Sequence, residues 1–551
     1  MLITRRGFTG GALSIALASQ LADPARAQAN ATLATALAAI RRFAETQRAF
    51  FGLPGITLGV TTPDGFATTL DFGVANLDSR AAIGSDTLFQ IGSITKCMTA
   101  LLLHQFAAHG RLNLGARLSD LMPAIPLPSG NAVTLQHLLD HVAGLPADAP
   151  VFPKGGLWTA YAPGEHWHYS NTAYEILGKL AEQVGGKPLA SLFAEHIFAP
   201  LGMSRSRGAI IADDRALYAQ GYEAADQMPF ARGVALAPAA WVDVTFGAGS
   251  VASTAADMNR FVRALAGLTQ GRGGLGLSAA QGRAFANHAV PSDTRGMSYG
   301  NGLMHVADGG RAYLHHTGGM VSFSSSFHLD AASGVGAFAS VNIGAFAEYR
   351  PRLLTRFAVD ALTNALAGRP LPHPPALDYA LANAESYVGR YAGPAGTFEV
   401  VRGAPLTIVA DGTSAALQVW GGEIFRTTHP AFRRFSLMFQ RERDAVVAAH
   451  WGPASYVRDG AAVTLPPSDP RLARLAGRYV SDSPWLGLDE VVERGGRLSI
   501  GTEVPMERVG RDTWRVGSDD WSPERASFAN AIDGRPQSFF YSGQEFIRHD
   551  I

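Results

Sequence analysis

The 551-residue sequence has little of what proteins use for cross-linking and for binding charged partners. It contains one cysteine, Cys97, which excludes an intramolecular disulfide. Charged residues make up 17% of the chain, below the roughly 25% of an average soluble protein, and 46 acidic residues balance 46 basic ones. Nucleic acid is therefore not an expected partner, because binding to its phosphates depends on an excess of positive charge.

The N-terminal segment lacks an apolar run long enough to cross a membrane. The uncharged stretch between Arg6 and Asp23 is shorter than the about 20 residues that a spanning helix needs. Arg5 and Arg6 precede this stretch and small residues around Ala27 follow it, which is typical of a twin-arginine export signal. We therefore expect residues 1–27 to be a signal peptide, removed from a periplasmic protein without a transmembrane segment.

The remaining chain is too long for one compact core, and its pattern changes near residue 369. Strand-like runs at 56–61 and 335–341 frame helical stretches such as 94–109, which predicts an α/β unit over residues 28–368. Helix 94–109 is followed by Gly110, a common helix stop. The proline-rich segment 369–375 then predicts a linker.

Beyond the linker the chain repeats itself. Gly-Arg-Tyr at 389–391 recurs at 477–479, and later markers of the two copies keep the same order. Short apolar runs separated by glycine, aspartate and proline predict small antiparallel β-barrels at 385–463 and 471–551. The second copy carries extra residues around 481–489, which predicts a longer loop there.

A serine and a lysine at the start of helix 94–109 have the spacing that nucleophilic catalysis needs. Ser93 and Lys96 are three residues apart, so their side chains share one helix face. The helix N-terminus stabilises negative charge that develops near the serine oxygen. Because only four lysines occur in the chain and this helix is otherwise apolar, a solvated surface lysine does not explain Lys96. The pair is typical of a serine nucleophile beside a basic group.

Two further groups can share a cleft with this pair. Tyr169 and Asn171 stand in an apparent loop before an expected helix at 172–185. The second group ends an expected strand, where glycines permit close backbone approach to a ligand, and comprises His316, Thr317, Gly318 and Gly319.

Taken in this order, the three groups resemble the penicillin-recognising serine hydrolases of the class C β-lactamase type. The resemblance covers about residues 45–350 and includes the supporting segments 134–146, 200–203 and 249–258. It implies a β-lactamase/transpeptidase-like α/β unit, with an antiparallel sheet flanked by helices and a helical subdomain. Two trailing barrels, of lipocalin-like form, further resemble the D-aminopeptidase branch and the peptidases that open linearised microcystins.

The resemblance also implies a mechanism. Ser93 is the nucleophile that forms an acyl-enzyme, and Lys96 and Tyr169 share the proton transfers, with the identity of the base left open. The N–H groups of Ser93 and Gly319 form the oxyanion hole. Asn171 and His316, with Thr317 and Gly318, hold the substrate and the proton network, and neither a metal nor another cofactor is implied.

One departure from the family pattern bears on the substrate. β-Lactamases carry Lys-Thr-Gly where this chain has His316-Thr317-Gly318, and a neutral imidazole attracts a β-lactam carboxylate less than a lysine does. We therefore predict an exported peptidase acting on a small peptide. The alternatives are a carboxylesterase acting on an ester, a weak β-lactamase, and a penicillin- or peptidoglycan-binding protein without turnover; the oligomeric state is not predicted.

Two other features of the sequence have a functional interpretation. The histidines at 137, 141, 166 and 168 raise the question of a zinc site, but zincins need a glutamate directly after the first histidine, where this chain has Leu138. No metal site is therefore predicted. In the second barrel we expect the loop with Asp482 and Trp485 to reach the cleft and limit substrate size.

Overall fold

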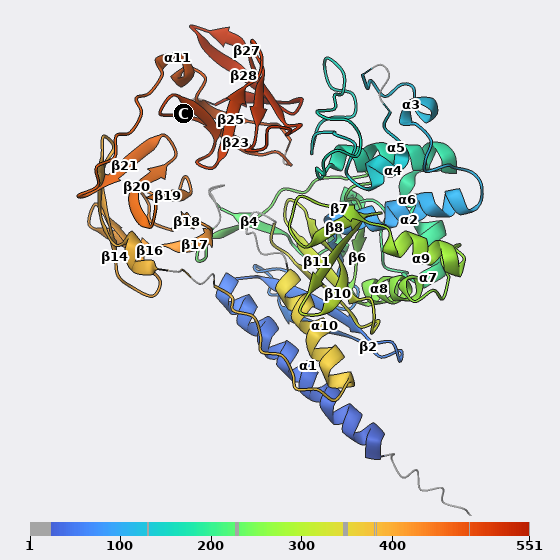
Figure 1. The fold of residues 1–551 in the computed structure, drawn as a ribbon. Coiled ribbons are helices and arrows are strands. Elements are labelled where there is room, and N and C mark those ends of the chain that lie inside the picture. The colour runs from blue at the N-terminus through green and yellow to red at the C-terminus, as the bar shows by residue number, and fades with distance from the viewer. Residues whose placement is uncertain are drawn as a thin grey trace, which may run out of the picture.

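The computed structural model describes residues 24–128, 132–225, 231–344, 351–378, 381, 383–483 and 485–549 (Figure 1). The predicted signal peptide at 1–27 lies outside these residues except for its last four, which begin helix α1 (Pro24–Phe51). Within the described ranges no helix is both long and apolar enough to cross a membrane.

The α/β unit predicted over residues 28–368, which we call the catalytic-type unit, is built on one antiparallel sheet of eight strands. The predicted strands at 56–61 and 335–341 are its neighbouring strands β1 and β12, with Ile56 paired to Val341. In spatial order the sheet consists of β2 (Ala67–Gly73), β1 (Gly55–Thr61), β12 (Gly336–Val341), β11 (Ser324–Asp330), β10 (Arg311–Gly319), β9 (Leu303–Asp308), β8 (Met297–Gly300) and β7 (Val290–Pro291).

Helices cover both faces of this sheet, which is why β1, β11 and β12 are buried along their whole length. Ile56, Leu58 and Val60 of β1 pack against α1 and α10 (Arg352–Leu366). On the opposite face Gly59 lets helix α8 (Ala255–Thr269) approach closely, because a Cβ at Gly59 would lie 2.7 Å from the carbonyl oxygen of Ala255. The predicted α/β class with flanking helices is confirmed.

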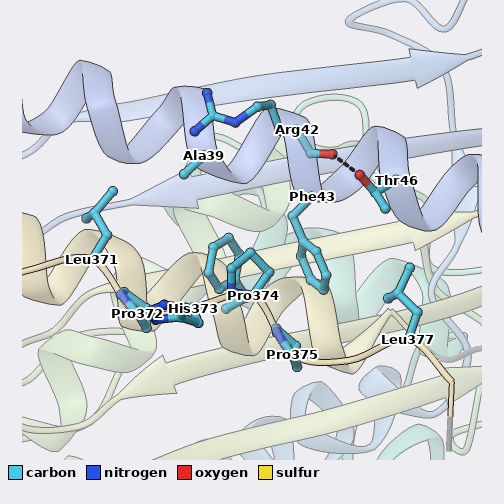
Figure 2. A pocket seen from close by; sticks show the side chains of 11 residues that line it. Ala39, Arg42, Phe43, Thr46, Leu371, Pro372, His373, Pro374, Pro375 and Leu377 are labelled. Atoms are coloured by element: carbon cyan, nitrogen blue, oxygen red, sulfur yellow. Dashed lines mark hydrogen bonds between the residues drawn. The ribbon is translucent and has the colours of Figure 1, made fainter.

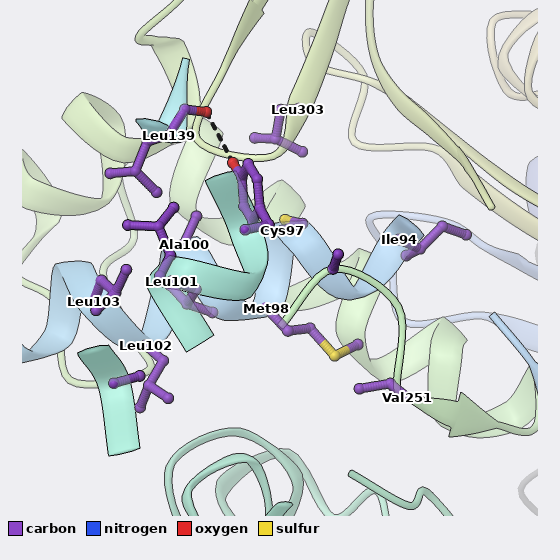
Figure 3. Close-up of a cluster of buried hydrophobic side chains, with 14 of the residues drawn as sticks. Ile94, Cys97, Met98, Ala100, Leu101, Leu102, Leu103, Leu139, Val251 and Leu303 are labelled. Carbon is purple, nitrogen blue, oxygen red and sulfur yellow. Dashed lines mark hydrogen bonds between the residues drawn. The ribbon is translucent and has the colours of Figure 1, made fainter. Parts of the chain in front are cut away.

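The helical subdomain surrounds α2 (Thr95–Ala108), the helix that follows Ser93. Side chains on all sides of α2 are buried, and Figure 3 shows Leu139, Val251 and Leu303 from three other segments around it. The other helices of the unit are α3 (Leu118–Leu121), α4 (Leu135–Leu139), α5 (Asn171–Gly185), α6 (Leu189–Phe193), α7 (Ala199–Leu201) and α9 (Ala279–Asn287). Two-stranded ladders join β3 (Phe89–Gln90) to β6 (Ala252–Ser253) and β4 (Tyr222–Ala224) to β5 (Leu236–Pro238).

The proline-rich linker follows the surface of the catalytic-type unit. Leu371, Pro374 and Leu377 lie beside α1, close to Phe43 and Thr46, as Figure 2 shows. Proline suits this path because it needs no backbone hydrogen-bond partner for an N–H group.

Two antiparallel β modules follow the linker, and the repeated Gly-Arg-Tyr motif has the same structural role in both. Tyr391 and Tyr479 are 0% exposed, and their hydroxyl groups donate to the carbonyl groups of Tyr387 and Leu475, at 2.8 and 2.7 Å. In the second module, Arg548 of the last strand packs against the glycine of the motif. A Cβ at Gly477 would lie 2.2 Å from Arg548 Nη1. The motif therefore joins the first and last strands of each module.

The two modules differ in closure and in one connection. The second is a closed barrel of eight strands, whereas the strand pairing of the first runs from β16 to β17 as a curved nine-stranded sheet. The first module contains β13 (Gly389–Gly393), β14 (Gly396–Val401), β15 (Thr407–Ala410), β16 (Thr413–Ala416), β17 (Gln418–Gly421), β18 (Ile424–Arg426), β19 (Leu437–Glu442), β20 (Ala445–Trp451) and β21 (Ala454–Arg458). After α11 (Pro470–Ala473), the barrel contains β22 (Gly477–Val480), β23 (Leu488–Arg494), β24 (Arg497–Ile500), β25 (Val504–Arg508), β26 (Trp514–Val516), β27 (Arg525–Ile532), β28 (Arg535–Tyr541) and β29 (Gln544–Arg548). The connection 481–487 between β22 and β23 is longer than its counterpart between β13 and β14.

Candidate active site

Ser93 lies in a single 3-10 turn, Gly92–Ile94, that leads directly into α2. This turn packs against the end of β10 without intervening side chains. A Cβ at Gly318 would lie 1.8 Å from the carbonyl oxygen of Ile91, and Gly92 adopts a φ of 54°. Glycine is therefore required at both positions for the strand and the turn to meet.

Lys96 lies one helical turn beyond Ser93 and is 0% exposed. Its Nζ atom is 3.0 Å from Ser93 Oγ, 2.6 Å from Asn171 Oδ1 and 3.0 Å from the carbonyl oxygen of Ala248. Burial lowers the pKa of Lys96 to about 7, although the negative charge of Asp148 acts in the opposite direction. The amine can therefore exist in its neutral form near neutral pH, with a lone pair available to the Ser93 hydroxyl.

Tyr169 lies beside this amine. Lys96 Nζ is 4.7 Å from the centre of its ring, and the ring also lies 6.2 Å from that of His316. Tyr169 and Asn171 flank Ser170, whose hydroxyl accepts the Ala173 N–H and so starts α5. The helix N-cap thus fixes the segment that presents both side chains.

His141 holds the backbone on both sides of Tyr169. Its carbonyl oxygen accepts the N–H of His168 at 2.8 Å, and its Nδ1 atom accepts the N–H of Ser170 at 3.1 Å. The imidazole ring lies 4.5 Å from the Tyr169 ring. Burial and nearby positive groups lower the pKa of His141 well below its usual value, which keeps Nδ1 free to accept. The residue reaches this position through a left-handed φ of 61°.

His316 is 1% exposed and has both ring nitrogens in use. Its Nδ1 lies 2.6 Å from the carbonyl oxygen of Thr317, and its Nε2 lies 3.1 Å from the hydroxyl of Tyr299. A carbonyl group can only accept, so Nδ1 carries the proton, and in the neutral ring Nε2 accepts from Tyr299.

At the end of β10, the backbone N–H of Gly319 is left outside the strand ladder, beside the Ser93 turn. Met320 N–H donates to the carbonyl of Phe323 at 2.8 Å, which closes the β10–β11 hairpin. Because hydrogen-bonded and non-bonded pairs alternate in an antiparallel ladder, the N–H of Gly319 points away from its partner Ser324. A Cβ at Gly92 would lie 2.8 Å from the Gly319 carbonyl oxygen and 2.9 Å from its nitrogen, so the Gly319 backbone lies directly against the Ser93 turn.

These groups surround a cleft of about 590 Å³. Ser93, Tyr169, Asn171, His316, Thr317 and Gly319 line it, whereas Lys96 and Gly318 are buried and are not among the lining residues. Two carboxylates, Asp148 and Glu175, also line it, and burial raises the pKa of each. Among the described lining residues there is no lysine or arginine. The wall therefore carries acidic groups without a surface cation.

The second barrel supplies one side of the cleft. Ser483, Trp485 and Leu486 of the loop 481–487 line it together with Gln544, and Trp485 lies 6.0 Å from Phe246. Asp482, expected to face the cleft with Trp485, is instead exposed and is not part of the wall. Ser483, the next residue, lines the cleft in its place. The carboxylates on the cleft wall, Asp148 and Glu175, therefore belong to the catalytic-type unit.

Sequence reasoning missed three residues that shape this site. Asp148 accepts from Asn171 Nδ2 at 2.7 Å, Tyr299 contacts His316, and His141 holds the Tyr169 segment. His141 belongs to the segment 134–146 that supports the family resemblance, but the sequence suggests no role for its side chain except the zinc ligand considered above.

The four histidines considered for zinc have separate partners. His137 Nδ1 accepts the Thr134 N–H at the start of α4, His166 stacks on Trp521 and His168 contacts Glu524. In the described parts of the chain no three histidine, cysteine, aspartate or glutamate side chains are grouped as metal ligands.

Comparison with known proteins gives one family. The protein-family model described as Beta-lactamase matches residues 40–359. A Beta-lactamase of Pseudomonas fluorescens is 32% identical over 183 residues, which are 31% of this chain and 51% of that protein. The chain thus spans about half the length of that curated relative.

Solved structures share the fold at low sequence identity. The octameric penicillin-binding protein homologue from Pyrococcus abyssi aligns with a TM-score of 0.55 and 21% identity, covering 77% of this chain and all (100%) of that one. D-amino acid amidase from Ochrobactrum anthropi SV3 aligns with a TM-score of 0.52 and 23% identity, covering 60% of this chain and 99% of that one.

Proposed function

The chain belongs to the Beta-lactamase family of serine hydrolases, and from this premise we propose that it is a peptidase that cleaves amide bonds through an acyl-enzyme on Ser93. The observation that carries the proposal is the 3.0 Å contact between Ser93 Oγ and the buried Nζ of Lys96. A serine needs a base within hydrogen-bond reach to become a nucleophile, and this contact provides one.

In the proposed acylation, neutral Lys96 is the base. It keeps two donations, to Asn171 Oδ1 and the Ala248 carbonyl, and turns its lone pair to Ser93. Ser93 Oγ attacks the carbonyl carbon and its proton passes to Lys96. The oxyanion is stabilised by the N–H groups of Ser93 and Gly319. Tyr169, beside Lys96, relays the proton to the leaving amine, and water then releases the acyl group by the reverse transfers.

We propose that the substrate is a small peptide with a free amino group, as in enzymes of the D-aminopeptidase or linearised-microcystin-peptidase type. Support comes from the charge of the cleft, where Asp148 and Glu175 favour an ammonium group and disfavour a carboxylate. His316 also stands where β-lactamases have a lysine. A β-lactam carboxylate therefore has no cationic partner on the described cleft wall.

The test is a substrate panel on purified protein. It contains D- and L-amino-acid p-nitroanilides, their N-acetylated counterparts, linear peptides, short-chain esters and nitrocefin. We expect free-amine amides to be cleaved with the highest kcat/KM and the Ser93→Ala variant to be inactive on all of them. Nitrocefin or ester turnover above the amide rates, or wild-type activity in Ser93→Ala, would overturn the proposal. A burst without steady turnover would instead identify a binding protein.

We also propose that the enzyme is exported to the periplasm, on the strength of the Arg5-Arg6 pattern alone. Fractionation of cells that express the full sequence tests this. The wild type is expected in the periplasmic fraction, trimmed near residue 27, and an Arg5→Lys, Arg6→Lys variant is expected to stay untrimmed in the cytoplasm. Equal distribution of both would refute the signal.

A further inference from the structure

Glu524, just before β27 of the second barrel, is a buried carboxylate that binds the catalytic-type unit. It is 7% exposed. Its Oε1 accepts the N–H of Ala147 at 2.7 Å and faces His168 Nε2 at 2.9 Å. Its Oε2 accepts the hydroxyl of Ser542 within the barrel. One side chain thus joins two loops of another domain to its own barrel.

Both loops that Glu524 contacts lead directly to the proposed catalytic groups. The carbonyl of Ala147 accepts the N–H of Asn171 at 2.7 Å, and the next residue, Asp148, accepts from the Asn171 side chain. His168 directly precedes Tyr169, and its own N–H is bound by His141. A shift of either loop therefore displaces Asn171 or Tyr169 relative to Ser93.

The surrounding contacts keep Glu524 in place. Trp158 Nε1 donates to the carbonyl of Pro523 at 2.8 Å, and Trp521 stacks on His166 with ring centres 4.6 Å apart. From the far side, Gln544 Nε2 donates to the carbonyl of Asp148 at 3.0 Å. The second barrel therefore touches this region at several points, of which Glu524 is the buried, charged one.

We infer that Glu524 is a positioning residue, which holds the Ala147–Asp148 and His168–Tyr169 segments in their active arrangement from the second barrel. The inference rests on the proposed function. It assigns to the barrel a part in turnover itself, beyond any limit that its loop sets on substrate size.

Two substitutions at 524 separate the effect of the hydrogen bonds of Glu524 from the effect of its charge. A glutamine at 524 can still accept from Ala147 and His168 through its oxygen and can donate to Ser542 through its amide nitrogen. An alanine removes all three contacts and leaves the Ala147 N–H without its partner. Glu503, exposed in the same barrel, is a matched control for loss of a carboxylate.

The experiment compares Glu524→Ala, Glu524→Gln and Glu503→Gln with the wild type in the full chain. Displacement of catalytic groups by about 1 Å typically costs about 100-fold in rate, so kcat of Glu524→Ala is expected to fall by about 10- to 100-fold with a smaller change in KM. Glu524→Gln is expected to keep most of kcat, and Glu503→Gln all of it. Wild-type kcat in Glu524→Ala, or an equal loss in Glu524→Gln, would overturn the inference.

A second readout is independent of turnover. Hydrogen exchange of peptides spanning 144–150 and 166–171 reports the held segments directly, and faster exchange is expected in Glu524→Ala but not in Glu503→Gln. If Glu524→Ala does not fold, His168→Ala, which removes one contact, replaces it. Unchanged exchange would refute the positioning role even in an active enzyme. If the wild type cleaves no substrate while the exchange pattern holds, the proposed function fails and the contact stands.

Discussion

The buried amine of Lys96 sets a pH dependence that the sequence does not reveal. Its pKa is lowered to about 7 by burial, so the neutral form, which is the proposed base for Ser93, is lost as the pH falls below this value. For the same reason folding favours release of this proton. The contribution of Lys96 to the free energy of unfolding is therefore expected to rise with pH between about 7 and the ordinary lysine pKa of 10.5.

The first prediction follows from the charge of Asp148, which raises the pKa of Lys96. Asp148→Asn keeps an acceptor for Asn171 but removes this charge, so the acidic limb of the activity profile is expected to move to lower pH. The measurement is kcat/KM against pH with a neutral ester, which avoids recognition of a substrate amine. Glu175→Gln is the control and should leave the limb in place. A limb that moves to higher pH in Asp148→Asn would contradict the assignment.

The second prediction concerns His141 as the residue that orders the Tyr169 segment. Asparagine tolerates the left-handed φ of 61° and can accept the Ser170 N–H, whereas leucine can do neither. His141→Asn is expected to retain most of kcat and His141→Leu to lose about 10- to 100-fold. Steady-state kinetics at matched folded fractions, checked by thermal unfolding, distinguish the two. Equal activity in both variants would show that the contact with Ser170 is dispensable.

At the scale of elements, the contact between β10 and the Ser93 turn leaves no room for a side chain. The third prediction is that Gly318→Ala lowers the free energy of unfolding by about 1–3 kcal/mol, because its Cβ would lie 1.8 Å from the Ile91 carbonyl oxygen. The same shift should separate the Gly319 N–H from Ser93 and reduce kcat by about 100-fold. Gly84→Ala, whose Cβ meets only an ordinary contact at 3.6 Å, is the control. Denaturant unfolding and kinetics check both parts.

The elements also show what can be predicted from sequence. Ser93 and Lys96 were predictable as neighbours because their spacing of three residues, across the 3-10 turn and the first turn of α2, decides their contact. The strands β1 and β12 were predictable from their apolar runs, which the helices on both faces require. The closure of the two modules was not predictable. In the first module the edge strands β16 and β17 do not pair with each other, whereas the strands of the second form a closed barrel. Pairing between strands leaves no local pattern in the sequence.

The same limit explains the parts of the site that were missed. His141 acts through Ser170, which is 29 residues away, and Glu524 acts through Ala147, which is 377 residues away. Each depends on a loop conformation that brings distant backbone groups together. Asp482 was a plausible cleft carboxylate by composition, but the direction of a single loop residue follows from the fold around it.

At the scale of the whole molecule, the second barrel reaches the cleft through its loop 481–487. The fourth prediction is that Trp485→Ala raises kcat/KM for bulky or N-acylated substrates by about 10-fold while small substrates change little, because Trp485 forms part of the cleft wall. Phe152→Ala, at a side chain that is 60% exposed and outside the cleft wall, is the control. An unchanged specificity profile would show that the loop does not limit substrate size.

Removal of the whole barrel should behave differently from this single change. A chain truncated after Gly460 lacks both the loop and Glu524, so it is expected to lose turnover on small substrates as well. Folding of the truncated chain is checked by circular dichroism before the rates are compared.

The contact of Glu524 with Ala147 can form only late in the synthesis of a new chain. At about 5–20 residues per second, a ribosome needs about 20 to 75 s to synthesise the 377 residues that separate the two partners. During this interval Ser93 and Lys96 are already made, but the segments that present Tyr169 and Asn171 lack their support. From the inferred role of Glu524, an unfinished chain, or one cut short before the second barrel, is therefore expected to turn over substrate more slowly than the finished chain.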